Sequence, residues 1–193
     1  MEEIIDWYKN LNNKVKLAIK VSLFLIIITL ITVLFINFFY APMLINGNSM
    51  NPALSNKDVV IIDKRAYKND EPERFDLIAF KYRYDYSQKY IKRVIALPGE
   101  TVYIEENRIY IKGEFDNEFT ELKEYYGKFE GEAQLTECNP VTLGEGEYFV
   151  LGDNRYDSDD SRSSVGIVKK KTIIGKAVFR LFPFNGIGSL KYQ

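Results

Sequence analysis

The stretch Val21–Tyr40, VSLFLIIITLITVLFINFFY, decides how this chain is organised, because none of its 20 residues is charged. A helix of roughly 20 apolar residues is long enough to cross the hydrocarbon core of a bilayer, which is about 30 Å thick. The apolar core of a secretory signal peptide is shorter, at roughly 7–15 residues. The sequence therefore predicts a transmembrane helix at 21–40, rather than a cleaved signal or a buried core helix.

The charges on either side of this stretch predict its orientation. No Lys or Arg follows it until Lys57, whereas four lysines precede it: Lys9, Lys14, Lys16 and Lys20. Segments that stay in the cytoplasm carry an excess of Lys and Arg. We therefore expect a protein of the cell membrane that spans it once, with residues 1–20 as a cytoplasmic tail and residues 41–193 as an extracytoplasmic domain.

Composition limits the kinds of function that this domain can have. The 193 residues suffice for one domain of roughly 150 residues and an appendage, and the 46% of hydrophobic residues suffice for a core. The formal net charge of −1 argues against a nucleic-acid partner, since such domains are usually strongly basic. Cys138 is the only cysteine and histidine is absent, so we expect no internal disulfide, no metal site and no cofactor.

Beyond Pro42 the pattern predicts a mainly β domain. Short runs rich in β-branched and aromatic residues alternate with turn residues such as Asn46-Gly47 and Pro98-Gly99. Residues 101–113, TVYIEENRIYIKG, have the alternation and the short polar turn of a hairpin. The predicted strands are 59–62, 77–80, 92–97, 102–104, 109–111, 148–151 and 173–181.

Two parts of this domain carry other patterns. Tyr82, Tyr84 and Tyr86 alternate with polar residues, which predicts one face of a half-buried strand. The alternative for these tyrosines is an aromatic surface at the bilayer interface, where tyrosine is enriched. Residues 113–140 are acidic and weakly patterned, and we expect them to form a surface excursion from the β-core.

A serine and a lysine are the candidates for catalysis. Ser49 lies in the turn-prone segment Gly47-Asn48-Ser49, within about ten residues of the apolar stretch. A serine hydrolase without histidine needs another general base, and lysine is the usual substitute. The pKa of a lysine must then fall from about 10.4 to about 7–8. Lys92 lies among apolar strand residues whose burial would lower it, although a solvated side chain is the alternative.

A third candidate segment is Gly152–Arg162, GDNRYDSDDSR, which is dense in Asp, Ser and Arg. Such a segment is compatible with a solvated loop or with a calcium loop, although it lacks the terminal glutamate of an EF-hand. In a serine–lysine site, a serine of this segment could orient the lysine amine. An Asp–Arg pair could hold the loop in place.

In order and spacing, these pieces resemble the bacterial type I signal peptidases, which are membrane-bound serine–lysine proteases. The resemblance covers residues 15–185 and rests on four motifs. These are GNSMNPAL at 47–54, KDVV at 57–60, KRVIALPGE at 92–100 and GDNRYDSDDSR at 152–162. The resemblance implies a membrane-bound endopeptidase that removes signal peptides from exported preproteins, with preproteins and membrane lipid as its partners.

The resemblance also assigns roles at matching positions. It implies that Ser49 is the nucleophile, that Lys92 is the general base and that Ser158 orients the lysine by a hydrogen bond. It implies that Asp160 and Arg162 hold the active-site loop.

This chain departs from the family pattern at a few positions. Some members have a serine for the oxyanion at the place of Gly47, which leaves the Ser49 backbone N–H as the expected donor here. Ala53, Ala96 and Asp157 stand where threonine, glycine and asparagine are usual, and these changes bear on packing more than on catalysis.

The family prefers small side chains, such as alanine, at the first and third residues before the cut. The substrate backbone is expected to pair as an added strand. Phe182 and Phe184 are expected to reach the membrane interface. Apolar residues on a shallow cleft would accept alanine and exclude bulkier side chains; the matching positions are Ile45, Met50, Leu54, Val60, Tyr90 and Ile91.

Two alternatives remain open at this point, and a third is disfavoured. One is a maturation protease of the same fold with a narrow substrate set. The second is a non-catalytic, membrane-tethered β-domain, which a missing serine or lysine would have favoured. Repressor-type self-cleaving proteases also use serine and lysine, but they lack a membrane span, so the apolar stretch argues against them.

Overall fold

The computed structural model describes residues 7, 10–124 and 137–190, and the chain divides into two compact units, Met1–Phe39 and Tyr40–Gln193. The first unit holds helix α2 (Asn13–Phe39), whose residues are all exposed or half-buried. The helix is long and apolar enough to cross a membrane. An apolar surface on every side of a helix is typical of a membrane span when no protein covers it.

The bounds of α2 differ slightly from the predicted 21–40. The helix begins eight residues earlier, where the Asn12 side chain accepts a hydrogen bond of 3.0 Å from the Lys14 backbone N–H, as in a helix N-cap. It ends at Phe39, so Tyr40 belongs to the first strand. Pro42 explains this end, because proline cannot continue a helix and disfavours the helical conformation of the residue before it.

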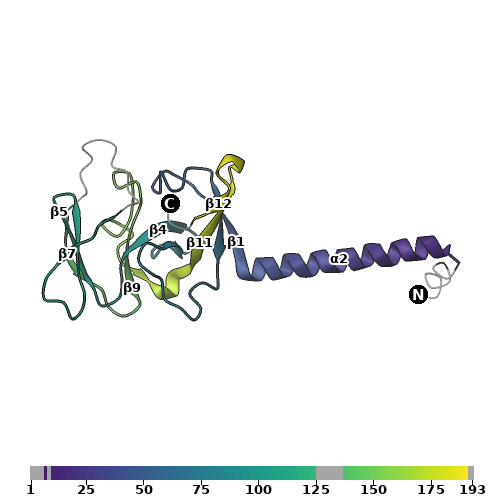
Figure 1. Cartoon of the computed structure of the whole chain (residues 1–193), viewed down its shortest axis with the longest axis horizontal. Helices are drawn as coiled ribbons and strands as arrows, with labels where there is room; N and C mark the ends of the chain where they lie inside the picture. Colours follow the sequence, from purple (N-terminus) through teal and green to yellow (C-terminus); the bar gives the residue numbers. More distant parts are fainter. Residues whose placement is uncertain (1–6, 8–9, 125–136, 191–193) are drawn as a thin grey trace. The chain divides into compact units, whose positions relative to one another are not determined.

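The second unit is built from two antiparallel sheets (Figure 1). The large sheet has the strand order β1-β2-β11-β3-β4-β9-β10, with β12 paired to β11. Its strands are β1 (Tyr40–Leu44), β2 (Val59–Asp63), β3 (Leu77–Lys81), β4 (Lys89–Ala96), β9 (Glu147–Leu151), β10 (Val168–Lys169), β11 (Ile173–Phe182) and β12 (Gly188–Ser189). Two short 3-10 helices flank β11, η1 (Lys170–Thr172) and η2 (Phe184–Gly186).

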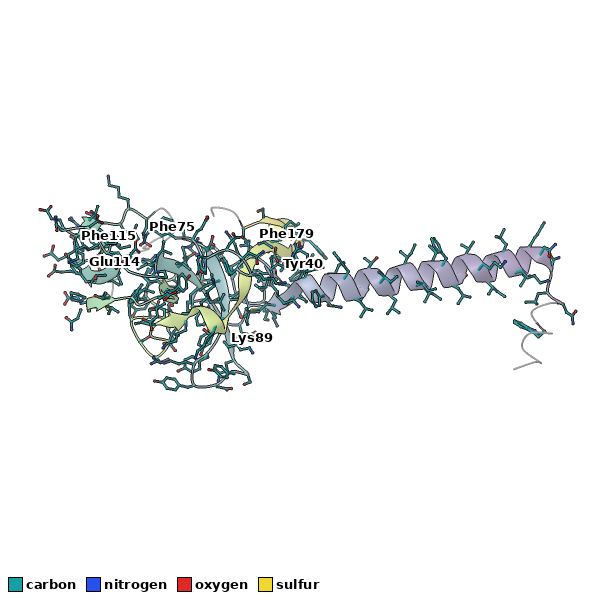
Figure 2. The ribbon with its side chains drawn as sticks, turned by 90° about the horizontal axis from the view of Figure 1, so that it is seen from below. Tyr40, Phe75, Lys89, Glu114, Phe115 and Phe179 are labelled. Atoms are coloured by element: carbon teal, nitrogen blue, oxygen red, sulfur yellow. The ribbon has the colours of Figure 1, made fainter. Side chains whose placement is uncertain are left out.

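The small sheet has the order β7-β6-β5-β8 and lies at the end of the β-domain away from β1 and β12 (Figure 1). Its strands are β5 (Thr101–Glu105), β6 (Arg108–Lys112), β7 (Thr120–Glu121) and β8 (Cys138–Thr142). In Figure 2, Glu114 and Phe115 mark this end, whereas Tyr40 and Phe179 mark the other. The mainly β prediction is thereby confirmed, and the seven strands from 59–62 to 173–181 that were predicted by residue range are present.

The predicted hairpin is confirmed as β5–β6, with Thr101 opposite Lys112 and Glu105 opposite Arg108. Its two-residue turn consists of Glu106 and Asn107, both with positive φ, at 47° and 64°. Two successive residues with positive φ match the twist of the flanking strands, which is why short hairpins favour this turn.

The tyrosine-rich segment 82–88 is a loop, so the predicted strand face there is wrong. β3 ends at Lys81 and β4 begins at Lys89. The Asp85 carboxylate accepts hydrogen bonds from the Ser87 N–H at 2.9 Å and from the Gln88 side chain at 3.0 Å. A local side-chain bond of this kind competes with strand pairing, which the alternating pattern does not reveal.

The acidic segment 113–140, which we expected to form a surface excursion, contains a strand toward each of its two ends. β7 pairs with β6, and β8 pairs with β5, so both ends belong to the small sheet. Residues 125–136 lie outside the described part of the chain.

The core beneath the segment 45–58 ties together the parts that carry the candidate catalytic residues. Met50 and Leu54, which follow Ser49, are buried in one cluster with Val60 of β2 and Ile91 of β4. Burial of a side chain of this size contributes about 1.5–3 kcal/mol, so the serine segment and β4 are held on one packed layer.

Candidate active site

Ser49 and Lys92, which are 43 residues apart in the chain, are in direct contact. Ser49 lies in the turns between β1 and β2, and Lys92 lies in the middle of β4 opposite Ile78 of β3. The Lys92 Nζ donates a hydrogen bond of 2.5 Å to the Ser49 Oγ. The structure therefore brings together the two residues that the sequence nominates as nucleophile and base.

The Lys92 ammonium is almost removed from water, with 3% of the residue exposed. Burial lowers the pKa of Lys92 to about 8, against the opposing effect of the Asp160 and Asp159 carboxylates. Burial acts in this direction because a low-dielectric environment disfavours the charged form. A substantial fraction of Lys92 is thus the neutral amine near pH 8, the form that can accept a proton from a hydroxyl.

The segment around Ser49 is held by local hydrogen bonds. Gly47 has a φ of +99°, a conformation that residues with a side chain rarely adopt, and its N–H donates to the Asn56 side chain at 3.0 Å. The Asn51 N–H donates to the Asn48 carbonyl at 2.9 Å. Among the residues that the structure describes, the Ser49 N–H has no hydrogen-bond partner, so it is free to donate to an oxyanion.

The loop that begins at Gly152 packs directly on the serine segment. The Asn154 N–H donates to the Ser49 carbonyl at 3.0 Å, and its side chain donates to the Asn48 carbonyl at 3.3 Å. A Cβ on Gly152 would lie 2.4 Å from the Ser49 carbonyl oxygen and 2.1 Å from the Ser158 Oγ. Only glycine fits at this contact. The role of Asn154 was missed in the sequence, although the residue lies inside the fourth motif.

Asp160 and Arg162 lie together beneath this loop. The Asp160 carboxylate is fully buried and accepts hydrogen bonds from the Gly152 N–H at 3.0 Å and from the Arg162 guanidinium at 2.8 Å. Arg162 also donates to the Arg155 carbonyl at 2.9 Å. This is the arrangement expected of a pair that holds a loop, because charged groups stay buried only when they are paired and hydrogen-bonded.

Ser158 is close to the site, yet it makes no hydrogen bond to Lys92 in this structure. Its Oγ is buried and has no hydrogen-bond partner among the described residues. The hydroxyl packs against Gly152, which itself contacts the Ser49 backbone. The orienting role of Ser158 therefore stays a prediction.

Sequence reasoning also missed a second ion pair, which lies on the other side of β4. The Arg93 guanidinium donates to both carboxylate oxygens of Asp153, at 2.8 and 2.6 Å, and to the Phe75 carbonyl at 2.9 Å. Both partners are buried. Because Lys92 and Arg93 are neighbours in a strand, their side chains point to opposite faces. Lys92 points toward Ser49, and Arg93 points toward Asp153 of the loop. Both residues lie in quoted motifs, but neither motif indicates the pairing.

A cavity of about 280 Å³ opens beside Ser49 and Lys92. Four of the predicted substrate-binding residues line it, namely Ile45, Met50, Tyr90 and Ile91. Leu54 and Val60 do not line the cavity: both have 0% exposure and pack in the core behind Met50 and Ile91. The motif places them near the site in sequence, whereas packing in the core covers their side chains. The other lining residues are Met43, Leu44, Asn46, Gln88 and Lys89.

Two strand edges border this cavity. Among the described strands, β1 is an edge strand of its sheet and pairs with β2 alone. β9 pairs with β4 at Arg93, Val94 and Ala96, and within residues 10–124 and 137–190 no strand pairs with that same edge at Tyr90 to Lys92. Unpaired backbone groups at a strand edge are ready to pair with another extended chain. In the described part of the chain, no group of three His, Cys, Asp or Glu residues could hold a metal ion.

Comparisons with known proteins agree on one family. The model of the family "Signal peptidase, peptidase S26" matches residues 18–182. Signal peptidase I of Bacillus licheniformis is 38% identical over 170 residues, which cover 84% of this chain and 88% of that protein. Signal peptidase I S of Bacillus subtilis is 34% identical over 163 residues, which cover 83% and 87%. A crystal structure of a signal peptidase I from Enterococcus faecalis has 36% identity and a TM-score of 0.46, and covers 55% of this chain and 97% of that one.

Proposed function

Because the chain belongs to the signal peptidase family S26, we propose that it is a membrane-anchored endopeptidase that removes signal peptides with Ser49 as nucleophile and Lys92 as general base. The single observation that carries this proposal is the 2.5 Å contact between the Lys92 Nζ and the Ser49 Oγ. Burial supports it as well, since it lowers the pKa of Lys92 to about 8.

The first half of the proposed reaction is acylation. Neutral Lys92 takes the Ser49 hydroxyl proton while Oγ attacks the carbonyl carbon of the scissile bond. The oxyanion that forms accepts a hydrogen bond from the Ser49 N–H, which has no partner among the described residues. The Lys92 ammonium then gives its proton to the leaving amine, the C–N bond breaks, and the signal peptide remains as an ester on Oγ.

The second half is deacylation. Lys92, neutral again, removes a proton from a water molecule, whose oxygen attacks the ester carbonyl. Collapse of this second tetrahedral intermediate returns the proton to Ser49 and frees the carboxylate end of the signal peptide. The same donor at Ser49 N–H serves both oxyanions.

The cleft suits a substrate that binds in an extended conformation and has small residues next to the scissile bond. Its apolar lining by Ile45, Met50 and Ile91 suits a small apolar side chain such as that of alanine. The uncovered edges of β1 and β4 supply backbone groups for strand addition, which reads few side chains. Substrates of varied sequence are therefore expected, as long as the residues near the cut are small.

The membrane anchor is the last part of the proposal. Helix α2 has the length and the apolar surface of a span, and the lysines before and within its first turns favour a cytoplasmic N-terminus. Exposed apolar side chains lie on β11, η2 and the turn after η2, and Phe179 of β11 lies at the same end of the β-domain as Tyr40 of β1 (Figure 2). They suit the interface of a bilayer; they are Phe179, Leu181, Phe182, Phe184 and Ile187.

Cleavage of a synthetic preprotein in detergent tests the proposal. We expect wild-type protein to cut after an alanine, and Ser49→Ala, Lys92→Ala and the double variant to lose activity to a similar extent, because the two residues act as a unit. Near-normal cleavage by Lys92→Ala would remove the dyad mechanism. A wild-type protein that cuts no preprotein and is not labelled at Ser49 by a serine-acylating probe would be a non-catalytic tethered domain.

A further inference from the structure

Arg155 is buried inside the loop that packs on the nucleophile, and the mechanism above gives it no role. Its side chain is 2% exposed. The Nε donates to the Gly152 carbonyl at 2.9 Å, so the side chain folds back onto its own loop. A buried guanidinium is stable only when a carboxylate or several acceptors compensate its charge.

The compensating carboxylate comes from a distant part of the chain. Glu124 accepts two parallel hydrogen bonds from the Arg155 guanidinium, each of 2.5 Å, and its side chain is 11% exposed. Among the residues that the structure describes, Glu124 is the only carboxylate paired with Arg155. It lies just after β7, in the acidic segment to which the sequence assigned no role.

The contacts of Gly152 connect this ion pair to the nucleophile. Its carbonyl accepts from Arg155, its N–H donates to Asp160, and its α-carbon lies against the Ser49 carbonyl. Two residues further on, the Asn154 N–H donates to that same carbonyl at 3.0 Å. A loop held from both sides of Gly152 therefore sets the position of the Ser49 backbone.

We propose that Glu124 is a positioning residue of the active site, which holds the Gly152–Asn154 loop against Ser49 by neutralising Arg155 in a two-bond ion pair. The inference rests on the proposed function and deepens it, because it assigns the small-sheet side of the domain a part in the reaction. Without the carboxylate, the Arg155 charge is left buried and uncompensated, and the loop must shift to bring it to water.

The test uses the full chain in detergent and the variant Glu124→Gln, which keeps the shape of the side chain and removes its charge. We expect kcat for preprotein cleavage, and the rate of Ser49 acylation by a small serine-acylating probe, to fall about tenfold to a hundredfold, with KM little changed, because a displaced nucleophile impairs chemistry more than binding. Glu121→Gln is the matched control, since Glu121 makes only an exposed contact with Arg108 at 3.8 Å; we expect it to stay within about twofold of wild type.

A double-variant cycle separates positioning from a general loss of structure. In an Arg155→Met background, Glu124→Gln is expected to cause no further loss beyond about twofold, because the charge that it neutralises is gone. If Glu124→Gln alone fails to fold, the comparison in the Arg155→Met background still tests the inference. Unchanged acylation in Glu124→Gln, or an equal loss in both backgrounds, would overturn the inference. Wild-type protein that is acylated but cuts no preprotein would refute the proposed function alone, since the acylation rates still test Glu124.

Discussion

At the scale of single residues, the site depends on the free-energy cost of burying the Lys92 amine. Lys92 is useful as a base because its surroundings destabilise its charged form, and the same surroundings make it a burden on the folded state. The buried carboxylates of Asp153 and Asp160 differ from it, because each lies in a guanidinium pair that compensates its charge.

The pH dependence of cleavage should report the ionisation of Lys92. With a pKa of about 8 in the folded protein, kcat/KM is expected to rise about tenfold per pH unit below pH 8 and to level off above it. The rise reflects the growing fraction of neutral amine. A pH series with one preprotein measures it. An acid limb near pH 4, where carboxylates titrate, would be incompatible with lysine as the base.

Replacing Lys92 should stabilise the fold while it abolishes activity. The folded pKa of about 8 lies below the unfolded value of about 10.4, so protonation opposes folding. The penalty is full below about pH 8, is lost as the pH rises toward 10.4, and amounts to at most about 3 kcal/mol. Lys92→Met is therefore expected to be more stable than wild type at pH 7, and this difference should shrink between pH 8 and 10.

Urea unfolding in detergent at pH 7 and at pH 10 measures this difference. Lys89→Met serves as the control, because Lys89 is an exposed neighbour on the same strand. We expect that control to change stability by no more than about 0.5 kcal/mol at either pH. A Lys92→Met protein less stable than wild type at pH 7 would show that the amine is well solvated.

A methyl group on Gly152 should separate the loop from the nucleophile. The added Cβ would lie 2.4 Å from the Ser49 carbonyl oxygen, closer than real Cβ contacts. Gly152→Ala is expected to cost about 1–3 kcal/mol of stability and to lower kcat about a hundredfold. Gly188→Ala is the matched control, since nothing lies within 4 Å of its Cβ. The test is to measure kcat for Gly152→Ala and Gly188→Ala under the same conditions. Equal kcat for the two variants would show that the loop moves freely.

At the scale of elements, the site depends on where strands stop pairing. In the part of the chain that the structure describes, β4 is paired with β9 from Arg93 onward, so its first half is paired on one side and lines the cavity on the other. The serine segment crosses from β1 to β2 and meets that open half. An unpaired strand edge tends to pair with other chains and so favours aggregation. An open edge on β4 is therefore consistent with a strand that binds a ligand there.

The open edge makes a prediction about the substrate. If the peptide pairs with β4 as an added strand, N-methylation of substrate backbone amides near the cut should weaken binding, because each methyl removes one donor. We expect KM to rise about five- to tenfold for a methylated amide that faces β4. The neighbouring amide, which faces away, serves as the control. Equal effects at alternate amides would argue against a strand-like pose.

At the scale of the whole molecule, the helical unit and the β-domain have separate sources of stability. α2 has no buried residue and depends on its surroundings, whereas the β-domain has a core of its own. The exposed aromatic residues of β11 and η2 add a surface that suits lipid. These features fit a β-domain that works at the surface of a membrane.

The expected topology can be checked in intact cells or vesicles. A protease added from outside should digest the chain after Tyr40 and spare the N-terminal tail, because the lysines before Val21 favour the cytoplasmic side. Antibodies to each end identify the protected fragment. If the β-domain is digested only after the membrane is opened, the orientation is the opposite of the expected one. That result would contradict signal-peptide removal outside the cell.

Much of this protein could be predicted because the relevant information is local in the chain. A run of 20 uncharged residues implies a long apolar helix whatever surrounds it, and alternating β-branched residues predicted the β5–β6 hairpin to within a residue. Ser49 and Lys92 were nominated by their motifs and by the absence of histidine. For these features the physical cause lies within a short window of sequence.

Only the tertiary structure decided which distant groups meet, because burial and pairing depend on neighbours far away in the chain. The ion pairs Arg93–Asp153 and Arg155–Glu124 join segments that no local pattern connects. Leu54 and Val60 lie in the core rather than on the cleft, since packing decides which face of a segment is covered. The depressed pKa of Lys92 has the same origin: the sequence supplies the lysine, and the fold removes the water around it.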